Sequence, residues 1–291
     1  MAMMFTTLCF IILVWTTVAF CLVEGYGSSQ NLVLETIHGD IYDCVDIYKQ
    51  PTLLHPMPHK ERIKFAGISM NASPEIKSFT SATATITLYN FYVNGAGQYS
   101  SAAIFHQSAD NDPNFEQIQA GWIMDGGRKT GCYNNICPGF VQLDTDVPID
   151  YAFPKISRPM YDDYELEIQL YKDEDYYLLF QGAFSIGLWP ETLFNELRNG
   201  SQVVRYGGQA FTPAGQQFSP PMGNGNFEDG NPHTTCHMRQ VMYGVGYDQD
   251  VQPDESLVQT HQSRCYHEGS QHNAHDDYWD YNFVFGGAGF C

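Results

Sequence analysis

Apolar and polar residues alternate along many short segments of this chain, which is the pattern of β-strands with one buried face. The alternation is clearest over residues 83–88, 164–170 and 279–285. The polar run at residues 172–175 and the apolar run at residues 176–180 predict a hairpin turn and its return strand. With 26 glycines and 19 tyrosines, the chain is predicted to be an all-β protein that folds as an antiparallel β-sandwich.

One segment departs from the two-residue period. In residues 189–197, Pro190 suits the first position of a helix and Glu191 suits its first turn. Leu193 and Leu197 are four residues apart, so they would lie on one helical face. We therefore expect one short helix here, and packing on the sheet must stabilise it because short helices do not persist by propensity alone.

The first residues predict a secretory signal peptide over residues 1–25. Residues 5–23 are apolar apart from threonines, and Glu24 is the first charged side chain. A cut after Gly25, with Val23 at the third position back, fits the small-residue rule for cleavage sites. The alternative is an uncleaved membrane anchor, for which about 20 apolar residues would suffice. No later segment is apolar enough to span a bilayer, so no membrane association is expected once the signal is removed.

The remaining chain divides in two by composition. Residues 26–78 hold a proline- and histidine-rich stretch and most of the basic residues of the first hundred. Such a segment in front of an acidic body is typical of a linker or pro-segment. A plain N-terminal extension is the alternative. Residues 79–291 then form the predicted sandwich domain.

The formal net charge of −19 disfavours nucleic acids and anionic membranes as partners, because both repel a negative surface. Protonation at low pH relieves the self-repulsion of the chain. An acidic extracellular space such as the apoplast, or a vacuole, therefore suits it. Asn71 and Asn199 begin glycosylation sequons, as expected of a secreted glycoprotein, although either sequon can also be an ordinary loop.

The cysteine count indicates disulfide bonds. Of the 8 cysteines, the signal peptide contains Cys9 and Cys21, and an even number remains. An even number in a secreted chain favours disulfides, but the sequence does not choose among their pairings. The remaining cysteines are Cys44, Cys132, Cys137, Cys236, Cys265 and Cys291.

Other kinds of site lack support. The histidine-rich tail has no closed zinc pattern, and its neighbours are typical of a solvated loop. The residues concerned are His261, His267, His272, His275, Asp276 and Asp277. No Gly-Xaa-Ser-Xaa-Gly elbow or phosphate-cradling loop is present, and Gly207–Gly208 and Gly286–Gly287 are interpreted as turn or bulge positions. We therefore expect no metal and no cofactor.

Six sequence motifs follow one another in a fixed order. They lie at residues 38–56, 130–142, 189–194, 206–208, 221–227 and 285–291. Together they resemble the neprosin family, secreted plant glutamic peptidases that cut beside proline. The resemblance implies an inhibitory pro-segment in front of a β-sandwich whose concave face carries two glutamates. It also implies the disulfides Cys132–Cys137 and Cys265–Cys291, and it leaves Cys44 and Cys236 either paired with each other or free.

Two glutamines stand where the resemblance places the catalytic glutamates. Gln119 follows Ile118 and precedes Ala-Gly-Trp122, while Gln209 closes the run that begins at Tyr206. Trp122 and Tyr206 are expected to line the cleft. In the family one carboxylate takes a proton from water and the other supports the carbonyl oxygen or the leaving amine. Because an amide cannot take that proton, the resemblance implies a pseudopeptidase that binds proline-containing peptides or cell-wall components without cutting them.

The departures from the family extend beyond these two positions. Only residues 123–129 separate Trp122 from Thr130, where the family has a longer segment. A wall of the cleft is therefore expected to be missing. Residues 103–105 read Ala-Ile-Phe, whereas the family has a Gln-Ile-Trp strand.

Two alternative functions remain open. Glu116 or Asp125 is a candidate substitute acid, and either would make the protein an active acidic prolyl peptidase with a relocated base. A misplacement of about 1 Å is enough to weaken catalysis strongly. The other alternative is a non-enzymatic glycan-binding or structural module, since aromatic faces of β-sandwiches suit sugar rings.

Overall fold

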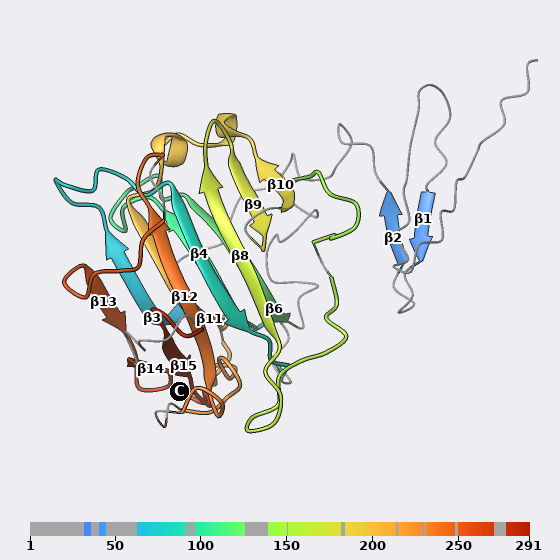
Figure 1. Ribbon diagram of the computed structural model, residues 1–291. Coiled ribbons are helices and arrows are strands. Elements are labelled where there is room, and N and C mark those ends of the chain that lie inside the picture. The colour runs from blue at the N-terminus through green and yellow to red at the C-terminus, as the bar shows by residue number, and fades with distance from the viewer. Residues whose placement is uncertain are drawn as a thin grey trace, which may run out of the picture.

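The computed structural model describes residues 32–35, 41–44, 63–90, 93, 97–125, 139–149, 151–181, 184–213, 215–227, 229, 231–247, 250–270 and 278–291. Two antiparallel sheets are packed against each other, which confirms the predicted all-β sandwich (Figure 1). None of the helices in these ranges has the length and apolar composition that a membrane crossing needs.

The larger sheet has eight strands in the order β14-β15-β12-β4-β8-β9-β10-β7. Its strands, in chain order, are β4 (Ser81–Thr87), β7 (Val141–Gln142), β8 (Glu165–Lys172), β9 (Tyr176–Phe180), β10 (Phe184–Trp189), β12 (Cys236–Gly244), β14 (His267–Ser270) and β15 (Phe283–Gly286). The hairpin predicted around residues 172–175 is confirmed, because β8 and β9 pair antiparallel on either side of that turn.

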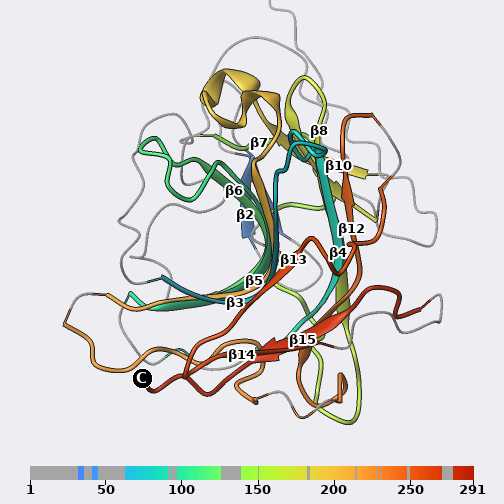
Figure 2. The ribbon, with the colours of Figure 1, turned by 90° about the vertical axis from the view of Figure 1, so that its left-hand side faces the viewer.

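The smaller sheet has five strands in the order β13-β3-β11-β5-β6. Its strands are β3 (Ile63–Asn71), β5 (Tyr99–Gln107), β6 (Gln117–Asp125), β11 (Val203–Phe211) and β13 (Val258–His261). A separate two-stranded sheet pairs β1 (Leu32–Glu35) with β2 (Ile41–Cys44). Figure 2 shows that the five-stranded sheet is bent and that its concave face is turned away from the eight-stranded sheet.

The core lies between the two sheets and is built from alternate strand positions. Ala82, Ala84 and Ile86 of β4 are fully buried there, as are Ile68 of β3 and Tyr206 of β11. The residues between them in sequence face the outside of each sheet, as the two-residue period requires. The pattern that predicted the strands therefore also defines which face of each sheet is available for binding.

The predicted short helix is wrong. Two 3-10 turns, Glu191–Leu193 and Leu197–Asn199, occupy this stretch. Phe194 between them is extended, with φ −114° and ψ 145°. Its ring packs edge-on against Tyr176, with 5.6 Å between ring centroids. In so short a segment this packing outweighs helix propensity.

The sandwich begins earlier than the composition indicated. β3 pairs with β11 along its whole length and also with β13. Residues 63–78 therefore belong to the sandwich, and the predicted boundary after residue 78 is corrected to a position before Ile63. The strand escaped prediction because Lys64 and Gly67 interrupt its apolar alternation. The β1–β2 hairpin lies in the part of the chain that precedes this boundary.

A row of very small residues crosses the middle of the five-stranded sheet. The register aligns Gly67 of β3, Gly207 of β11, Ala103 of β5 and Gly121 of β6. The glycines have φ values of 146°, 150° and 158°, where residues with a side chain are strained. A Cβ atom on Gly67 would lie 2.1 Å from the carbonyl oxygen of Tyr206. The close approach of neighbouring backbones at this row is therefore open to glycine alone.

Gly207 is not the turn or bulge position that the sequence suggested. Its register with both neighbouring strands is continuous. It is a central-strand glycine at a bend, which is the other common role of glycine in a strand.

We predict that Gly207→Ala destabilises the protein by at least about 3 kcal/mol, because the new Cβ would lie 2.2 Å from the carbonyl oxygen of Ala66. Gly246→Ala is the matched control. Gly246 also has a positive φ of 66°, but nothing lies within 4 Å of its Cβ position, so only backbone strain of about 1 kcal/mol is expected. Urea unfolding of both variants measures the difference. Equal losses of unfolding free energy in Gly207→Ala and Gly246→Ala would contradict the role of close backbone approach.

Candidate functional site

The concave face of the five-stranded sheet brings Gln119 and Gln209 onto one surface. Gln119 of β6 shares a row with Phe105 and Arg205, whereas Gln209 of β11 shares a row with Phe65 and Ser101. Residues that pair in register point to the same face of a sheet. Both glutamines therefore lie on the face opposite the core.

The two glutamine rows lie on either side of the glycine row. Each is two residues away from it, so the rows of Gln119 and Gln209 are four residues apart along the strands. In a flat sheet this is about 14 Å at roughly 3.4 Å per residue. The bend of the sheet inclines the two halves toward each other on the concave side (Figure 2). Between the rows, the residues Gly67, Gly207, Ala103 and Gly121 leave a shallow strip without large side chains, which we call the glycine strip.

The two amides have separate hydrogen-bond partners. The side-chain oxygen of Gln209 accepts a hydrogen bond from the Tyr99 hydroxyl at 3.1 Å. The side-chain oxygen of Gln119 accepts one from the Gln117 amide at 3.0 Å. Gln209 is 6% exposed, whereas Gln119 is half-buried and Gly121, on the edge strand β6, is exposed. The glycine strip is thus most open at its β6 end.

Aromatic rings and one cation flank the glycine strip. Phe65 and Phe105 pack edge to face, with 5.8 Å between centroids. The guanidinium of Arg205 lies 5.4 Å from the Phe65 ring centroid and donates a hydrogen bond to Asp110 at 2.6 Å. These contacts hold Phe65 and Arg205 against the sheet. The concave face therefore combines apolar ring surface with amide and guanidinium donors.

A serine and a histidine also meet on this face. Ser69 Oγ and His261 Nε2 are 2.7 Å apart, which is within the range of a nucleophile and its base. Ser69 is only 2% exposed, so a substrate carbonyl does not reach it in this conformation. The pair links β13 to β3. Burial, followed by the neighbouring Arg205 charge, lowers the pKa of His261, which leaves the ring neutral and able to accept from the serine hydroxyl.

A comparison with known protein families matches residues 96–288 to the family described as Neprosin. The matched range is more than half of the chain and contains both Gln119 and Gln209. The chain belongs to the Neprosin family. This confirms the resemblance inferred from the order of the sequence motifs. The Neprosin match also covers β5, β6 and β11, which are three of the strands that form the concave face.

Two residues expected to line the Neprosin cleft lie elsewhere. Trp122 is 7% exposed in the core, where its indole N–H donates to the Thr87 carbonyl at 2.8 Å. Tyr206 is fully buried, and its hydroxyl donates to the Met242 carbonyl at 2.8 Å. Each stands three positions from its glutamine, and an odd spacing in a strand places two residues on opposite faces. Trp122 and Tyr206 are therefore core residues rather than cleft residues.

Of the two candidate substitute acids, Glu116 is engaged away from the glutamines, whereas the side chain of Asp125 lies outside the described residues. The carboxylate oxygens of Glu116 accept hydrogen bonds of 2.9–3.2 Å from the backbone N–H groups of residues 195–197. Glu116 thus fixes the turn at the start of Leu197–Asn199. Asp125 is the last residue of β6, and the register pairs it with Tyr99.

The cysteines follow the Neprosin expectation where the structure describes them. The disulfide Cys265–Cys291 is present, with Cα atoms 6.0 Å apart. Lys64 Nζ donates to the Cys291 carbonyl at 2.9 Å, so the start of β3 is tied to the chain terminus. Cys236 is a free, buried thiol. Cys132 and Cys137 lie outside the described residues.

The two sequons differ in their local structure but not in their accessibility. Asn71 ends β3, and Asn199 ends the second 3-10 turn. Both asparagines are exposed. Exposure is the condition that a glycosyl acceptor must meet.

The most strongly perturbed carboxylate belongs to the other sheet. Glu165 accepts hydrogen bonds from Arg239 Nη2 at 2.6 Å and Nε at 2.8 Å, and a 3.0 Å contact joins it to His237 Nε2. Burial by itself raises the pKa of Glu165, but the hydrogen bonds from Arg239 and His237 outweigh burial and lower this pKa to about 2. A carboxylate with so low a pKa is a poor base near neutrality. The cluster instead joins β8 to β12.

We predict that Glu165 supports the fold in acid. Its pKa in the folded protein is about 2, below the ordinary value of 4.5. The stabilisation is therefore complete above pH 4.5 and is lost as the pH falls through about 2. One pKa unit corresponds to about 1.4 kcal/mol, so after allowance for its partial exposure the cluster contributes about 2 kcal/mol. Guanidinium unfolding of the natural protein and Glu165→Gln, from pH 7 to pH 2, measures this difference.

The matched control is Glu167→Gln, which alters an exposed carboxylate on the same strand. We expect the stability gap between the natural protein and Glu165→Gln to narrow below pH 4.5, whereas Glu167→Gln stays close to the natural protein throughout. A gap that is constant from pH 7 to pH 2 would show that the ionisation of Glu165 is not its cause.

Proposed function

We propose that this Neprosin-family protein is a secreted pseudopeptidase that binds extended, proline-containing peptides on its concave face without cutting them. The observation that carries the proposal is the pair of amides, Gln119 and Gln209, on the two sides of the glycine strip. The family context and the shared face support a common role for the two positions. Their chemistry supports binding rather than hydrolysis.

Hydrolysis needs a group that takes a proton from water. A glutamine side chain offers one acceptor oxygen and two N–H donors, and it does not ionise. General acid–base assistance contributes roughly 10²- to 10⁴-fold per group, and this contribution is lost at both positions. Two carboxylates near the concave face, Glu116 and Asp110, are held by backbone N–H groups and by Arg205, respectively. Neither is poised as a base for water.

The same groups are suited to hold a peptide. The glycine strip allows an extended backbone to approach the sheet closely at its β6 end, where Gly121 is exposed and has no side chain, whereas the rest of the strip is buried. Amide donors and acceptors on both sides match the carbonyl and N–H groups of such a backbone. Phe65 is half-buried and adds ring surface of the kind on which proline rings pack, whereas Phe105 is 1% exposed and only supports the Phe65 ring. A proline-rich peptide is already extended in solution, so it loses little conformational entropy on binding.

The segment before β3 is part of the proposal. We infer that residues 26–62 act as a pro-segment, as in the rest of the family. Without peptidase activity the chain cannot remove this segment itself. The proposed destination is an acidic extracellular space or vacuole, in keeping with the net charge of −19.

We predict that the natural protein does not cleave a proline-rich polypeptide between pH 2.5 and 7, because neither Gln119 nor Gln209 ionises. The double replacement Gln119→Glu, Gln209→Glu is expected to gain cleavage with an optimum near the ordinary glutamate pKa of about 4.3. Mass spectrometry of the products measures both. Cleavage by the natural protein that disappears in Glu116→Gln or Asp125→Asn would instead establish an active peptidase with a relocated base.

Binding is tested separately from cleavage. We predict that a proline-rich peptide binds the natural protein and that Gln209→Ala weakens the affinity about 3- to 10-fold, the effect of one lost hydrogen bond. Gln252→Ala is the matched control, since Gln252 is an exposed amide that follows Val251, which pairs with β12 of the other sheet. Isothermal titration calorimetry gives the affinities. Equal affinity for proline-containing and proline-free peptides would contradict the proposed specificity.

Maturation gives a further test. We predict that the secreted protein, purified and held in acid, keeps residues 26–62, because it has no activity with which to remove them. N-terminal sequencing and intact mass before and after incubation measure this. Spontaneous loss of the segment from protease-free material would contradict the proposal.

A further inference from the structure

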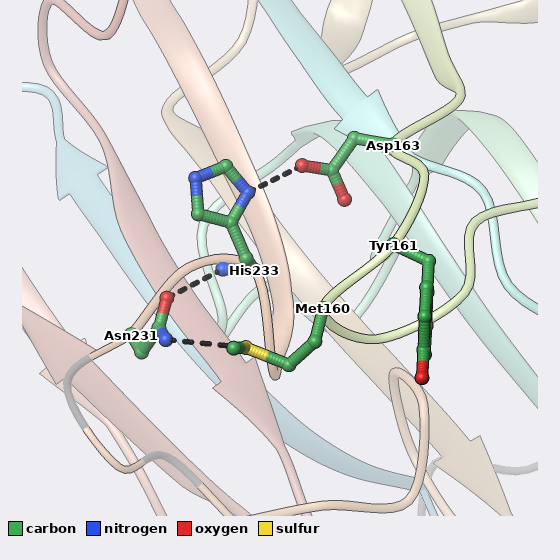
Figure 3. A pocket seen from close by; sticks show the side chains of 5 residues that line it. All are labelled: Met160, Tyr161, Asp163, Asn231 and His233. Atoms are coloured by element: carbon green, nitrogen blue, oxygen red, sulfur yellow. Dashed lines mark hydrogen bonds and ion pairs between the residues drawn. The ribbon is translucent and has the colours of Figure 1, made fainter.

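A hollow of about 290 Å³ lies away from the concave face, beside strands of the eight-stranded sheet (Figure 3). Two loops build it, one that leads into β8 and one that leads into β12. Its lining residues are Met160, Tyr161, Asp163, Asn231 and His233. None of them belongs to the proposed peptide-binding face, so the hollow requires its own explanation.

Hydrogen bonds hold the two loops in a fixed arrangement. The backbone N–H of Met160 donates to the His233 carbonyl at 2.8 Å. The backbone N–H of His233 donates to the Asn231 side-chain oxygen at 3.0 Å, and Asp163 Oδ2 lies 2.6 Å from His233 Nδ1. The first loop is closed on itself by the ion pair of Arg158 with Asp162. The hollow is thus preformed rather than dependent on a ligand.

Two large side chains at the hollow face solvent instead of packing in a core. Tyr161 is 84% exposed and Met160 is 65% exposed. Met160 also has a φ of 66°, a conformation that costs about 1 kcal/mol or more for a residue with a side chain. The Arg158 guanidinium lies 5.8 Å from the Tyr161 ring centroid. An exposed ring on a strained turn adds little to folding, and such strain is concentrated at functional sites.

The polar groups of the hollow complement this ring. The contact between Asp163 Oδ2 and His233 Nδ1 leaves Asp163 Oδ1 as an acceptor and His233 Nε2 as a second polar atom (Figure 3). The Asn231 side-chain nitrogen makes only a long contact of 3.6 Å with the Met160 sulfur. Donors and acceptors close to an aromatic ring are suited to a ligand that has hydroxyl groups on its rim and an apolar C–H face.

We propose that this hollow binds a neutral pyranose ring of a glycan, stacked on Tyr161 and hydrogen-bonded through its hydroxyls to Asp163, Asn231 and His233. Its volume of about 290 Å³ is at the lower limit of small-molecule sites, about 300–1,000 Å³, so it accommodates one or two sugar rings. The net charge of −19 and the carboxylate of Asp163 disfavour uronic acids. The expected ligands are therefore uncharged glycans, whether they are free polysaccharides or chains attached to a protein.

Titration of the full-length protein with soluble neutral oligosaccharides of gluco, manno, galacto and xylo configuration tests the proposal. An oligogalacturonide serves as the anionic comparison. We expect at least one neutral oligosaccharide to bind, Tyr161→Ala to weaken that binding at least tenfold, and Tyr161→Phe to retain most of it because the ring remains. Tyr247→Ala is the matched control, since Tyr247 is 86% exposed at another surface.

Three results would overturn the proposal. They are the absence of binding by every neutral oligosaccharide up to about 10 mM, binding that Tyr161→Ala leaves unchanged, and a preference for the oligogalacturonide. Retention is then compared between the natural protein and Tyr161→Ala on an insoluble neutral polysaccharide and on a glycosylated protein. The material that retains only the natural protein identifies the source of the sugar ring. Gln119→Ala and Gln209→Ala must leave sugar binding unaltered, which separates this site from the peptide-binding proposal.

Discussion

The close backbone contact along the glycine row is the constraint on which the concave face depends. Gly67, Gly207 and Gly121 lie in three different strands, yet the register brings them into one line. A Cβ atom at any of them would lie 2.0–2.2 Å from a neighbouring carbonyl oxygen. The bend that makes the sheet concave is therefore tied to residues without side chains. At the β6 end of the row, the same absence of a side chain leaves the exposed Gly121 as the place where an extended ligand could approach the sheet.

Under the proposed function, the fold and the chemistry of the family separate at this face. Bending and strand register depend on backbone geometry, so they persist when a carboxylate becomes an amide of nearly the same shape. Proton transfer depends on ionisation, so it does not persist. Gln119 and Gln209 keep their places on the concave face and hydrogen-bond to Gln117 and Tyr99, respectively. The proposed pseudopeptidase would in this way keep the peptide-binding role of its scaffold without the hydrolysis.

Local patterns in the sequence were sufficient for the architecture. The two-residue period predicted the strands that became β4, β8 and β15, and the polar turn at residues 172–175 with the apolar run after it predicted the hairpin of β8 with β9. The motif order predicted Neprosin membership and the Cys265–Cys291 disulfide. These features could be predicted from the sequence because each follows from residues that are close together in the chain or from a contiguous motif. The prediction of a helix at residues 189–197 was wrong because local propensity contains no information about the packing of Phe194 on Tyr176.

The sequence by itself determined the all-β class and the family, and it led to the proposal that two amides stand in place of catalytic acids, because residue identity and short-range order are enough for these. Only the tertiary structure decided which residues share a surface. Trp122 and Tyr206 lie in the core rather than in the cleft, and Glu116 accepts hydrogen bonds from a turn that is distant in sequence. The sandwich begins at β3, and two loops form the hollow beside Tyr161. Each of these depends on strand register or on loop contacts that join residues far apart in the chain, and such contacts leave no mark on local composition.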